Sequence, residues 1–241
     1  MAIHRFDSVS STNDVALRLA RGGAPDGECV VADAQSAGRG RGGHSWSSPP
    51  GKGLLFSVVL RPNWPPETLP LATIACGIAV ATGIRDETGL ETGLKWPNDI
   101  LVGGCKCAGI LCEAETDASG GAFVVAGVGI NVNTPPDALP PRPIFPATSL
   151  AAQAGAEFDR ERILMACLSR ITAEISRDEP PGRLADRFNG MDALRGRRLA
   201  AALPDGTVLT GLNLGIDGTG SLRLETPTGV ATVIAASISA V

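Results

Sequence analysis

The chain has 241 residues, 44% of them hydrophobic, so it can bury one large core and accommodate a small second domain. Its 21 basic and 25 acidic side chains give a net charge of −4, which argues against a protein that coats nucleic acid and makes any anion site local. Residues 1–23 are rich in charges and lack an apolar run, which excludes a signal peptide or a membrane span there and predicts a cytoplasmic protein.

The first half of the chain predicts helices and strands in mixed order. Ser10 to Asn13 supply helix-capping side chains, and Gly22 with Gly23 ends the helix that follows. Further apolar runs predict two strands, a buried helix and a third, short strand, at residues 29–32, 54–60, 71–87 and 100–102. A polar, glycine-rich loop separates the first two strands.

The second half favours an α+β fold over a doubly wound one. Residues 108–114 and 123–132 predict a long antiparallel hairpin. The six prolines from Pro135 to Pro146 indicate a surface connection that leads into a helix at about 159–177. Beyond residue 197, short apolar runs between turn signals predict a small β-barrel, so we divide the chain into domains of residues 1–192 and 193–241.

The six cysteines lie mostly in apolar stretches, where a reduced cysteine packs as a small hydrophobic residue. A zinc site of Cys105, Cys107 and Cys112 is the alternative. That spacing lacks a second cysteine pair, and the two histidines, His4 and His44, are remote in sequence. We therefore predict no protein-bound metal.

The strongest functional signal is the loop from Gln35 to Trp46, with the sequence QSAGRGRGGHSW. Its glycines allow close approach to the backbone, and the guanidinium groups of Arg39 and Arg41 can grip carboxylate or phosphate oxygens. A solvated linker is the alternative, which explains the glycines and arginines but not the tryptophan. The dinucleotide-binding fingerprint does not fit, because no helix begins after the glycines.

Three further segments place polar side chains beside apolar strands. The sequence KWPND brings Lys95, Asn98 and Asp99 together, although an ordinary turn has the same composition. Lys106 opens an apolar strand, where it is either a buried cation that needs an anionic partner or an edge lysine with its ammonium in water. Asn131 ends another apolar strand, where asparagine commonly forms a turn.

Taken in order, Ser11-Thr12-Asn13, GRGRGG with Trp46, KWPNDI, KCAGIL and GVGINVN resemble the motifs of the biotin protein ligase family along the whole chain. The resemblance implies an ATP-dependent ligase that forms biotinyl-5′-AMP and transfers biotin to a lysine of a biotin carboxyl carrier protein. It also implies a catalytic domain like that of class II aminoacyl-tRNA synthetases, with a mixed, mainly antiparallel sheet, followed by a barrel of the Src-homology-3 type. Because the first motif begins at residue 10, the chain resembles the short form without a DNA-binding domain.

The resemblance also implies roles for individual residues. The expected biotin contacts include neutral groups, which would bind the rings, and cations, which would bind the carboxylate. They are Ser11, Thr12, Asn13, Gln35, Gly38, Arg39, Gly40, Arg41, Lys106 and Gly109. The expected ATP contacts are Arg41, Trp46, Lys95, Asn98 and Asn131.

For the chemistry, the resemblance implies that Lys106, with Arg39 or Arg41, neutralises the biotin carboxylate and the α-phosphate, while Mg²⁺ binds the phosphates. Asp99 is expected to accept or electrostatically manage the proton of the acceptor lysine. Where many relatives have further basic residues, this chain has glycine, histidine and serine, so phosphate binding is expected to depend more on Arg41, Lys52 and Lys95.

Two other functions stay open from the sequence: a lipoate ligase-like enzyme and a non-catalytic biotin-binding module. KWPND and the paired arginines favour biotin, and the lysines with Asp99 favour catalysis. The sequence discloses neither the acceptor protein nor whether two chains form a homodimer through an exposed sheet edge.

Overall fold

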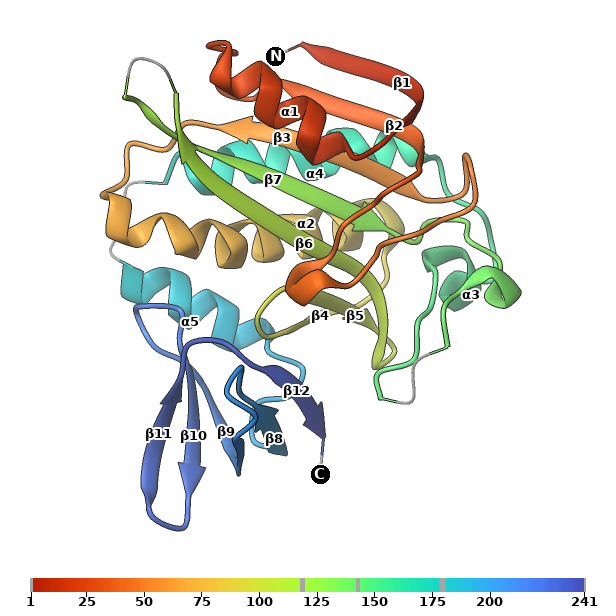
Figure 1. Ribbon diagram of the computed structural model, residues 1–241. Coiled ribbons are helices and arrows are strands. Elements are labelled where there is room, and N and C mark those ends of the chain that lie inside the picture. The colour runs from red at the N-terminus through yellow and green to blue at the C-terminus, as the bar shows by residue number, and fades with distance from the viewer. Residues whose placement is uncertain (1, 118–119, 142–143, 178–180, 241) are drawn as a thin grey trace.

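The computed structural model describes residues 2–117, 120–141, 144–177 and 181–240 (Figure 1). A seven-stranded sheet has the order β1-β2-β3-β7-β6-β5-β4, and a five-stranded sheet has the order β11-β10-β9-β8-β12. In the large sheet β1 is parallel to β2 and the other neighbours are antiparallel. The small sheet is antiparallel throughout. The predicted α+β class, with a mixed, mainly antiparallel sheet and a small β-structure at the C-terminal end, is confirmed.

The strands of the large sheet are β1 (Ile3–Val9), β2 (Cys29–Gln35), β3 (Leu54–Leu60), β4 (Thr92–Lys95), β5 (Asp99–Val102), β6 (Cys105–Thr116) and β7 (Ala122–Ile130). Those of the small sheet are β8 (Arg198–Ala202), β9 (Val208–Ile216), β10 (Leu222–Thr226), β11 (Gly229–Val233) and β12 (Ser237–Ala240). The α-helices are α1 (Thr12–Arg21), α2 (Ala72–Thr88), α3 (Leu150–Ala154), α4 (Arg160–Ile175) and α5 (Pro181–Met191).

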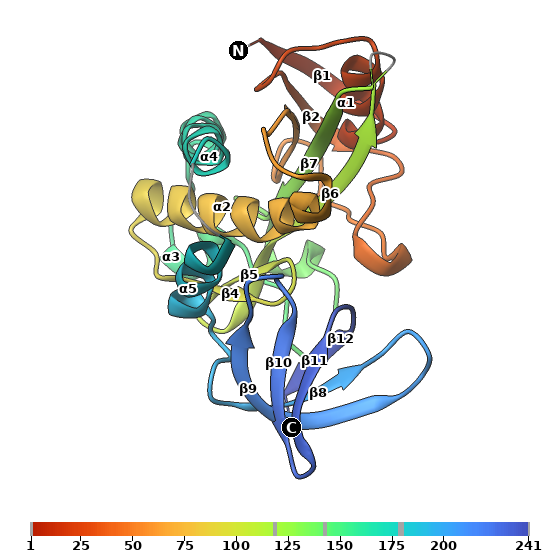
Figure 2. The same ribbon diagram turned by 90° about the vertical axis from the view of Figure 1, so that its left-hand side faces the viewer.

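The two faces of the large sheet are buried by different helices. Figure 2 shows α2 and α4 on one face and α1 on the other. Because side chains alternate along a strand, neighbours in sequence enter different cores: Val58 and Val124 pack with α2 and α4, whereas Val59 and Val125 pack with α1. This two-sided burial explains why the central strands read as continuous apolar runs.

Helix α2 is the centre of the larger core. With the 3₁₀ turn before it, the segment Pro66–Thr88 is long and apolar enough to cross a membrane, yet 72% of its apolar window is buried inside the protein. A Cβ atom at Gly83 would lie 3.0 Å from the backbone of Cys167 on α4, so glycine lets the two helices approach closely. The segment is therefore a core helix.

The predicted elements recur with small shifts of their ends, and the sequence missed β1, β4, α3 and α5. Strand β1 is an edge strand whose middle residues are exposed, so it lacks the apolar alternation that marks a half-buried strand. Strand β4 has four residues. One apolar cluster includes Leu94 of the large sheet and Leu222 of the small one, and the domain boundary at residues 192/193 stays a prediction.

Candidate functional site

Neutral polar side chains are fixed at the start of α1. Thr12 donates from its backbone N and its Oγ1 to Oε1 of Gln35, at 2.7 and 2.9 Å. The hydroxyl of Ser57 on β3 lies 2.8 Å from Oγ1 of Thr12 and 2.6 Å from Oδ1 of Asn13. Ser11, Thr12 and Asn13 are all buried. Donors and acceptors for an uncharged polar ring are thus held in place by the protein.

Two glycines of β7 make room for this arrangement. A Cβ atom at Gly127 would lie 2.0 Å from Oδ1 of Asn13, and one at Gly129 would lie 2.4 Å from the ring of Trp46. Residues two apart on a strand face the same side. The glycines of the GVGINVN motif therefore let Asn13 and Trp46 lie against the sheet.

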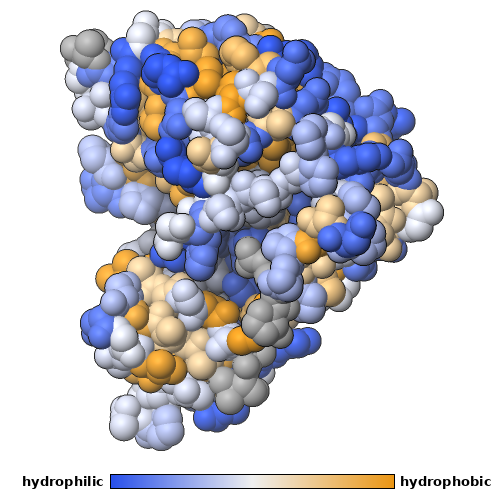
Figure 3. All heavy atoms as spheres, turned by 45° about the vertical axis from the view of Figure 1, so that its right-hand side comes forward, coloured by the Kyte–Doolittle hydropathy of each residue, from blue (hydrophilic) through white to orange (hydrophobic). Residues whose placement is uncertain are grey.

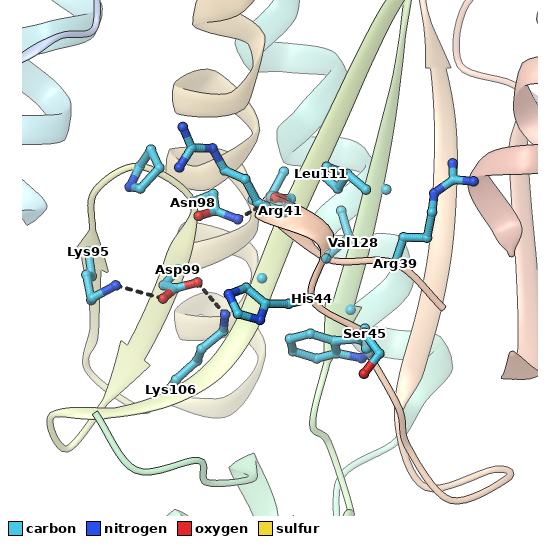
Figure 4. Close-up of a pocket in the computed structure, with 18 of the residues that line it drawn as sticks. Arg39, Arg41, His44, Ser45, Lys95, Asn98, Asp99, Lys106, Leu111 and Val128 are labelled. Carbon is cyan, nitrogen blue, oxygen red and sulfur yellow. Dashed lines mark hydrogen bonds and ion pairs between the residues drawn. The ribbon is translucent and has the colours of Figure 1, made fainter. Parts of the chain in front are cut away.

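A charged cluster joins three neighbouring strands (Figure 4). Lys95 ends β4, Asp99 begins β5, and Lys106 lies near the start of β6. Asp99 pairs with Nζ of Lys95 at 3.0 Å and with Nζ of Lys106, and the three side chains are only 10–11% exposed. Burial raises the pKa of Asp99, but the two ammonium groups outweigh it and hold that pKa below its ordinary value. The cluster is an ionised carboxylate between two cations.

Lys106 points into the protein, so its interpretation as an edge lysine with its ammonium in water is wrong. Its Nζ also lies 5.5 Å from the ring centre of Trp46. Its backbone pairs with the end of the proline-rich segment, through Lys106 N to Pro146 O at 2.8 Å and Thr148 N to Lys106 O at 2.9 Å. The proline-rich segment is mostly exposed, as expected of a surface connection, and it also contributes to the site, because the ring centre of Phe145 lies 5.1 Å from Nζ of Lys95.

The two arginines of the glycine-rich loop point in different directions (Figure 4). Arg39 pairs with Asp14 of α1 and, at 2.8 Å, with Glu113 of β6. Arg41 donates from Nη1 to the backbone oxygen of Ala236, beside the small sheet, at 3.3 Å. Both guanidinium groups are therefore held by protein partners that the sequence did not indicate.

Two cavities meet at Lys106. The first, of about 300 Å³, extends from Ser11 and Asn13 to Asp99 and Lys106. The second, of about 360 Å³, is lined by Asn131 and by Pro140, Pro141 and Ala147. Four residues line both cavities: His44, Ser45, Trp46 and Lys106. The surface is hollowed between the larger and the smaller part of the molecule (Figure 3).

The first cavity is locally positive in a protein of net charge −4. Its charged lining consists of four cations and one carboxylate, which are Arg39, Arg41, Lys95, Lys106 and Asp99. Such a lining attracts anions and weakens the repulsion between two of them. The geometry fits an acid and a phosphate ester that meet beside one lysine.

The structure brings most of the predicted site residues together. All the expected biotin contacts line the first cavity except Gly38, where a Cβ atom would lie 2.3 Å from Trp46 O, so glycine lets the loop close on itself. Of the expected ATP contacts, Asn98 donates to Ile110 O and Asn131 to Thr148 O, and Asn131 alone lines only the second cavity. Lys52 lines neither cavity and pairs with Glu157 at 3.0 Å.

Several residues of the site escaped the sequence analysis. Ser57 had a usable signal, because it is the one polar residue of an apolar strand. Ile144 and Phe145 had a weaker one, as apolar residues among prolines. Ala236 to Ile238 had none, because their place at the first cavity depends on how the two sheets meet.

No group of three or more His, Cys, Asp or Glu side chains suited to a metal ion occurs among the residues that the structure describes. The cysteine that is central to the zinc alternative, Cys107, is fully buried and lies 3.5 Å from Ile100 O. Burial raises the pKa of its thiol to about 12, so it stays protonated.

Two cavities that meet at a buried lysine on a mainly antiparallel sheet suit an adenylate-forming ligase, and comparison with known proteins shows that class. Residues 5–131 match the model of the biotin/lipoate A/B protein ligase family. The bifunctional ligase/repressor BirA of Bacillus subtilis is 38% identical over 96% of this chain and 72% of its own. The biotin–[acetyl-CoA-carboxylase] ligase of Paracoccus denitrificans is 32% identical over 95% of this chain and 96% of its own.

The solved structure of the biotin protein ligase from Aquifex aeolicus, in complex with biotin and ATP, has a TM-score of 0.83 and 25% sequence identity. The match covers 100% of this chain and 99% of that one. The chain belongs to the biotin/lipoate A/B protein ligase family and, within it, to the biotin protein ligases. The lipoate alternative and the non-catalytic alternative are not supported.

Proposed function

We propose that this biotin protein ligase activates biotin with ATP across the two cavities and then transfers it to a lysine of a carrier domain. The observation that carries the proposal is the position of Lys106, which lines both cavities and belongs to a buried cationic cluster. A relative of this fold has been solved with biotin and ATP together, which supports two neighbouring substrate sites.

In the first cavity, the rings of biotin are proposed to lie against Thr12, Asn13 and Gln35. These side chains are neutral and already hydrogen-bonded, so they can recognise polar ring atoms without a charge. The carboxylate then lies toward Lys106, where cations offset its charge. The biotin acid is thereby oriented toward the second cavity.

In the second cavity, the nucleotide is proposed to lie near Trp46 and Asn131, with its α-phosphate at the junction. A carboxylate and a triphosphate repel each other, so a shared cation lowers the barrier to their approach. Lys106 would neutralise both groups while a biotin oxygen attacks the α-phosphorus and pyrophosphate leaves. Arg41 would bind the phosphate after its guanidinium group releases the backbone oxygen of Ala236.

Asp99 is proposed to hold Lys95 and Lys106 in place. A proton acceptor works best when its pKa is near the working pH, and the pKa of Asp99 lies below its ordinary value. Of the two roles expected from the sequence, electrostatic management of charge is the one that this geometry favours.

Magnesium is proposed to enter with the nucleotide as MgATP. It prefers carboxylate and phosphate oxygens. The single carboxylate that lines the two cavities, among the residues that the structure describes, is Asp99, and two ammonium groups already occupy it. The phosphates would therefore supply most of the metal's ligands.

The glycine-rich loop is proposed to cover biotinyl-5′-AMP until the acceptor arrives. The intermediate is a mixed anhydride that water hydrolyses, so a loop that orders over it preserves it. Residues 39–45 are largely exposed, and Arg39 and Arg41 would exchange their protein partners for the ligand. The acceptor is a biotin carboxyl carrier domain, as the name of the Paracoccus ligase suggests for that protein.

The decisive experiment is biotin-dependent exchange of labelled pyrophosphate into ATP. We expect exchange with biotin and none with lipoate. Biotin should also raise the melting temperature more than lipoate does. A chain that binds biotin without exchange would contradict the proposal. Sedimentation with and without biotin would test whether two chains form a homodimer through an exposed sheet edge, such as that of β1.

A further inference from the structure

The proposed transfer step needs a proton acceptor that has not yet been assigned. A lysine amine is protonated near neutral pH, and it attacks a carbonyl carbon only after losing that proton. Asp99 is buried between two ammonium groups and is a poor acceptor. The acceptor therefore has to come from another side chain at the junction of the cavities.

The charged and titratable groups of the lining leave one candidate. From the loop come Arg39 and Arg41, and from strands β4, β5 and β6 come Lys95, Asp99 and Lys106. The guanidinium groups of Arg39 and Arg41 do not lose their protons, and Lys95 and Lys106 are ion-paired with Asp99, whose carboxylate they occupy. His44 is the one imidazole lining either cavity in the described part of the chain, and it lines both.

The backbone of the loop holds His44 at this junction. Arg39 and Ser45 form an isolated antiparallel bridge, and the backbone N of Gly40 donates to His44 O at 2.6 Å. The turn between them uses Gly42 at φ 67° and Gly43 at φ 78°, conformations that other residues rarely adopt. Figure 4 shows His44 projecting from the loop on the side of Asp99 and Lys106, while Arg39 points away.

His44 is also accessible to a macromolecule. Its side chain is exposed, whereas Lys106 and Asp99 lie deeper at 11% and 10% exposure. An acceptor lysine arriving from solvent therefore meets the imidazole before the buried cluster. A residue that contacts the acceptor has to be exposed before the acceptor binds.

We propose that His44 is the base of the transfer step, an inference that rests on the proposed ligase function. Its neutral imidazole takes one proton from the acceptor ammonium. The amine nitrogen then forms a bond to the biotinyl carbonyl carbon, the bond from that carbon to the phosphate oxygen breaks, and AMP leaves with the electron pair. The amide nitrogen loses its second proton to solvent, and imidazolium returns its proton to water.

The test measures the two half-reactions separately. Pyrophosphate exchange reports adenylate formation, and a single-turnover reaction of enzyme-bound biotinyl-5′-AMP with a purified carrier domain reports transfer. We expect His44→Gln to slow transfer at neutral pH about 100-fold, the lower end for loss of a general base, with exchange close to that of the wild type. The pH profile of transfer should differ between the wild-type protein and the variant, whereas the pH profiles of exchange should coincide.

Two further variants make the test specific. His44→Arg supplies a cation that can bind phosphate but no base, so its transfer should be as slow as that of His44→Gln. His4→Gln removes the other histidine, which lies on β1 and pairs with Glu28 at 2.5 Å, and should behave as the wild type in transfer.

Wild-type transfer by His44→Arg, or an equal fall of exchange and transfer in His44→Gln, would overturn the assignment and indicate a phosphate contact instead. Absence of biotin-dependent exchange in the wild-type protein would contradict the proposed function itself. The two failures are thus distinguishable.

Discussion

The buried cluster and the glycine-rich loop carry cations to the same site in opposite ways. Lys106 and Asp99 are 11% and 10% exposed and are fixed on neighbouring strands. Arg39 is 41% exposed, and Arg41 donates one hydrogen bond, to Ala236 O beside the small sheet, among the residues that the structure describes. In the proposed mechanism, the charges of the buried cluster are prearranged for every turnover, whereas those of the loop can move to admit and release ligands. Catalysis by fixed charges costs no reorganisation during the reaction.

The comparison predicts that removing a fixed cation has the largest effect. We expect Lys106→Ala to slow biotin-dependent pyrophosphate exchange by about 10²- to 10³-fold, because the charge that offsets both anions is lost. Lys52→Ala is the matched control, since Lys52 pairs with Glu157 on the surface and lines neither cavity. Unchanged exchange in Lys106→Ala would remove its assigned role.

The fixed part also includes the ring-binding end. We expect Gly127→Ala to weaken biotin binding by about 10- to 100-fold, because a Cβ atom 2.0 Å from Oδ1 of Asn13 displaces that side chain and its hydrogen bonds. Titration calorimetry measures the effect. Gly182→Ala on α5, where nothing lies within 4 Å of the added atom, is the control. Equal affinities would show that Asn13 does not contact biotin.

The arginines of the glycine-rich loop should affect retention of biotinyl-5′-AMP more than its formation. We expect Arg41→Gly to release biotinyl-5′-AMP about 10-fold faster, the effect of losing one charge-assisted hydrogen bond, and to slow pyrophosphate exchange less. A chase of labelled intermediate from the enzyme measures release. Arg5→Gly removes an exposed arginine paired with Glu161 and serves as the control. A larger fall in exchange than in retention would place Arg41 with the fixed charges.

The smallest effect should come from the contact that joins the fixed part to the small sheet. Nε1 of Trp96 donates to Gly220 O at 2.9 Å. We expect Trp96→Phe to lower the free energy of unfolding by about 1 kcal/mol, the net value of one hydrogen bond. Denaturant unfolding with tryptophan fluorescence and circular dichroism measures it. A stability equal to that of the wild type would show that this bond does not hold the two sheets together.

The sequence predicted the parts of the fold that depend on local pattern. The apolar runs of β3 and α2 and the hairpin of β6 and β7 could be placed because burial on both faces leaves a clear composition. Strand β1 could not, because its middle residues face solvent.

The site was predictable as a set of residues but not as a set of contacts. Lys95, Asp99 and Lys106 stood out individually, yet their pairing depends on the order of β4, β5 and β6 in the sheet. Arg39 pairs with Asp14 of α1 and Glu113 of β6, and no sequence motif predicts that these two elements lie together. The hydrogen bond of Arg41 to Ala236 could not be predicted without knowing where the small sheet lies relative to the large one.

The two glycines of β7 have a consequence for the distance between the two proposed substrate sites. Gly127 lies against Asn13, at the proposed biotin end, and Gly129 lies against Trp46, at the proposed nucleotide end. The two contacts are two residues apart on one strand, about 7 Å. The backbone of β7 thus fixes the distance between the two contacts, and this distance changes little when the surrounding side chains change.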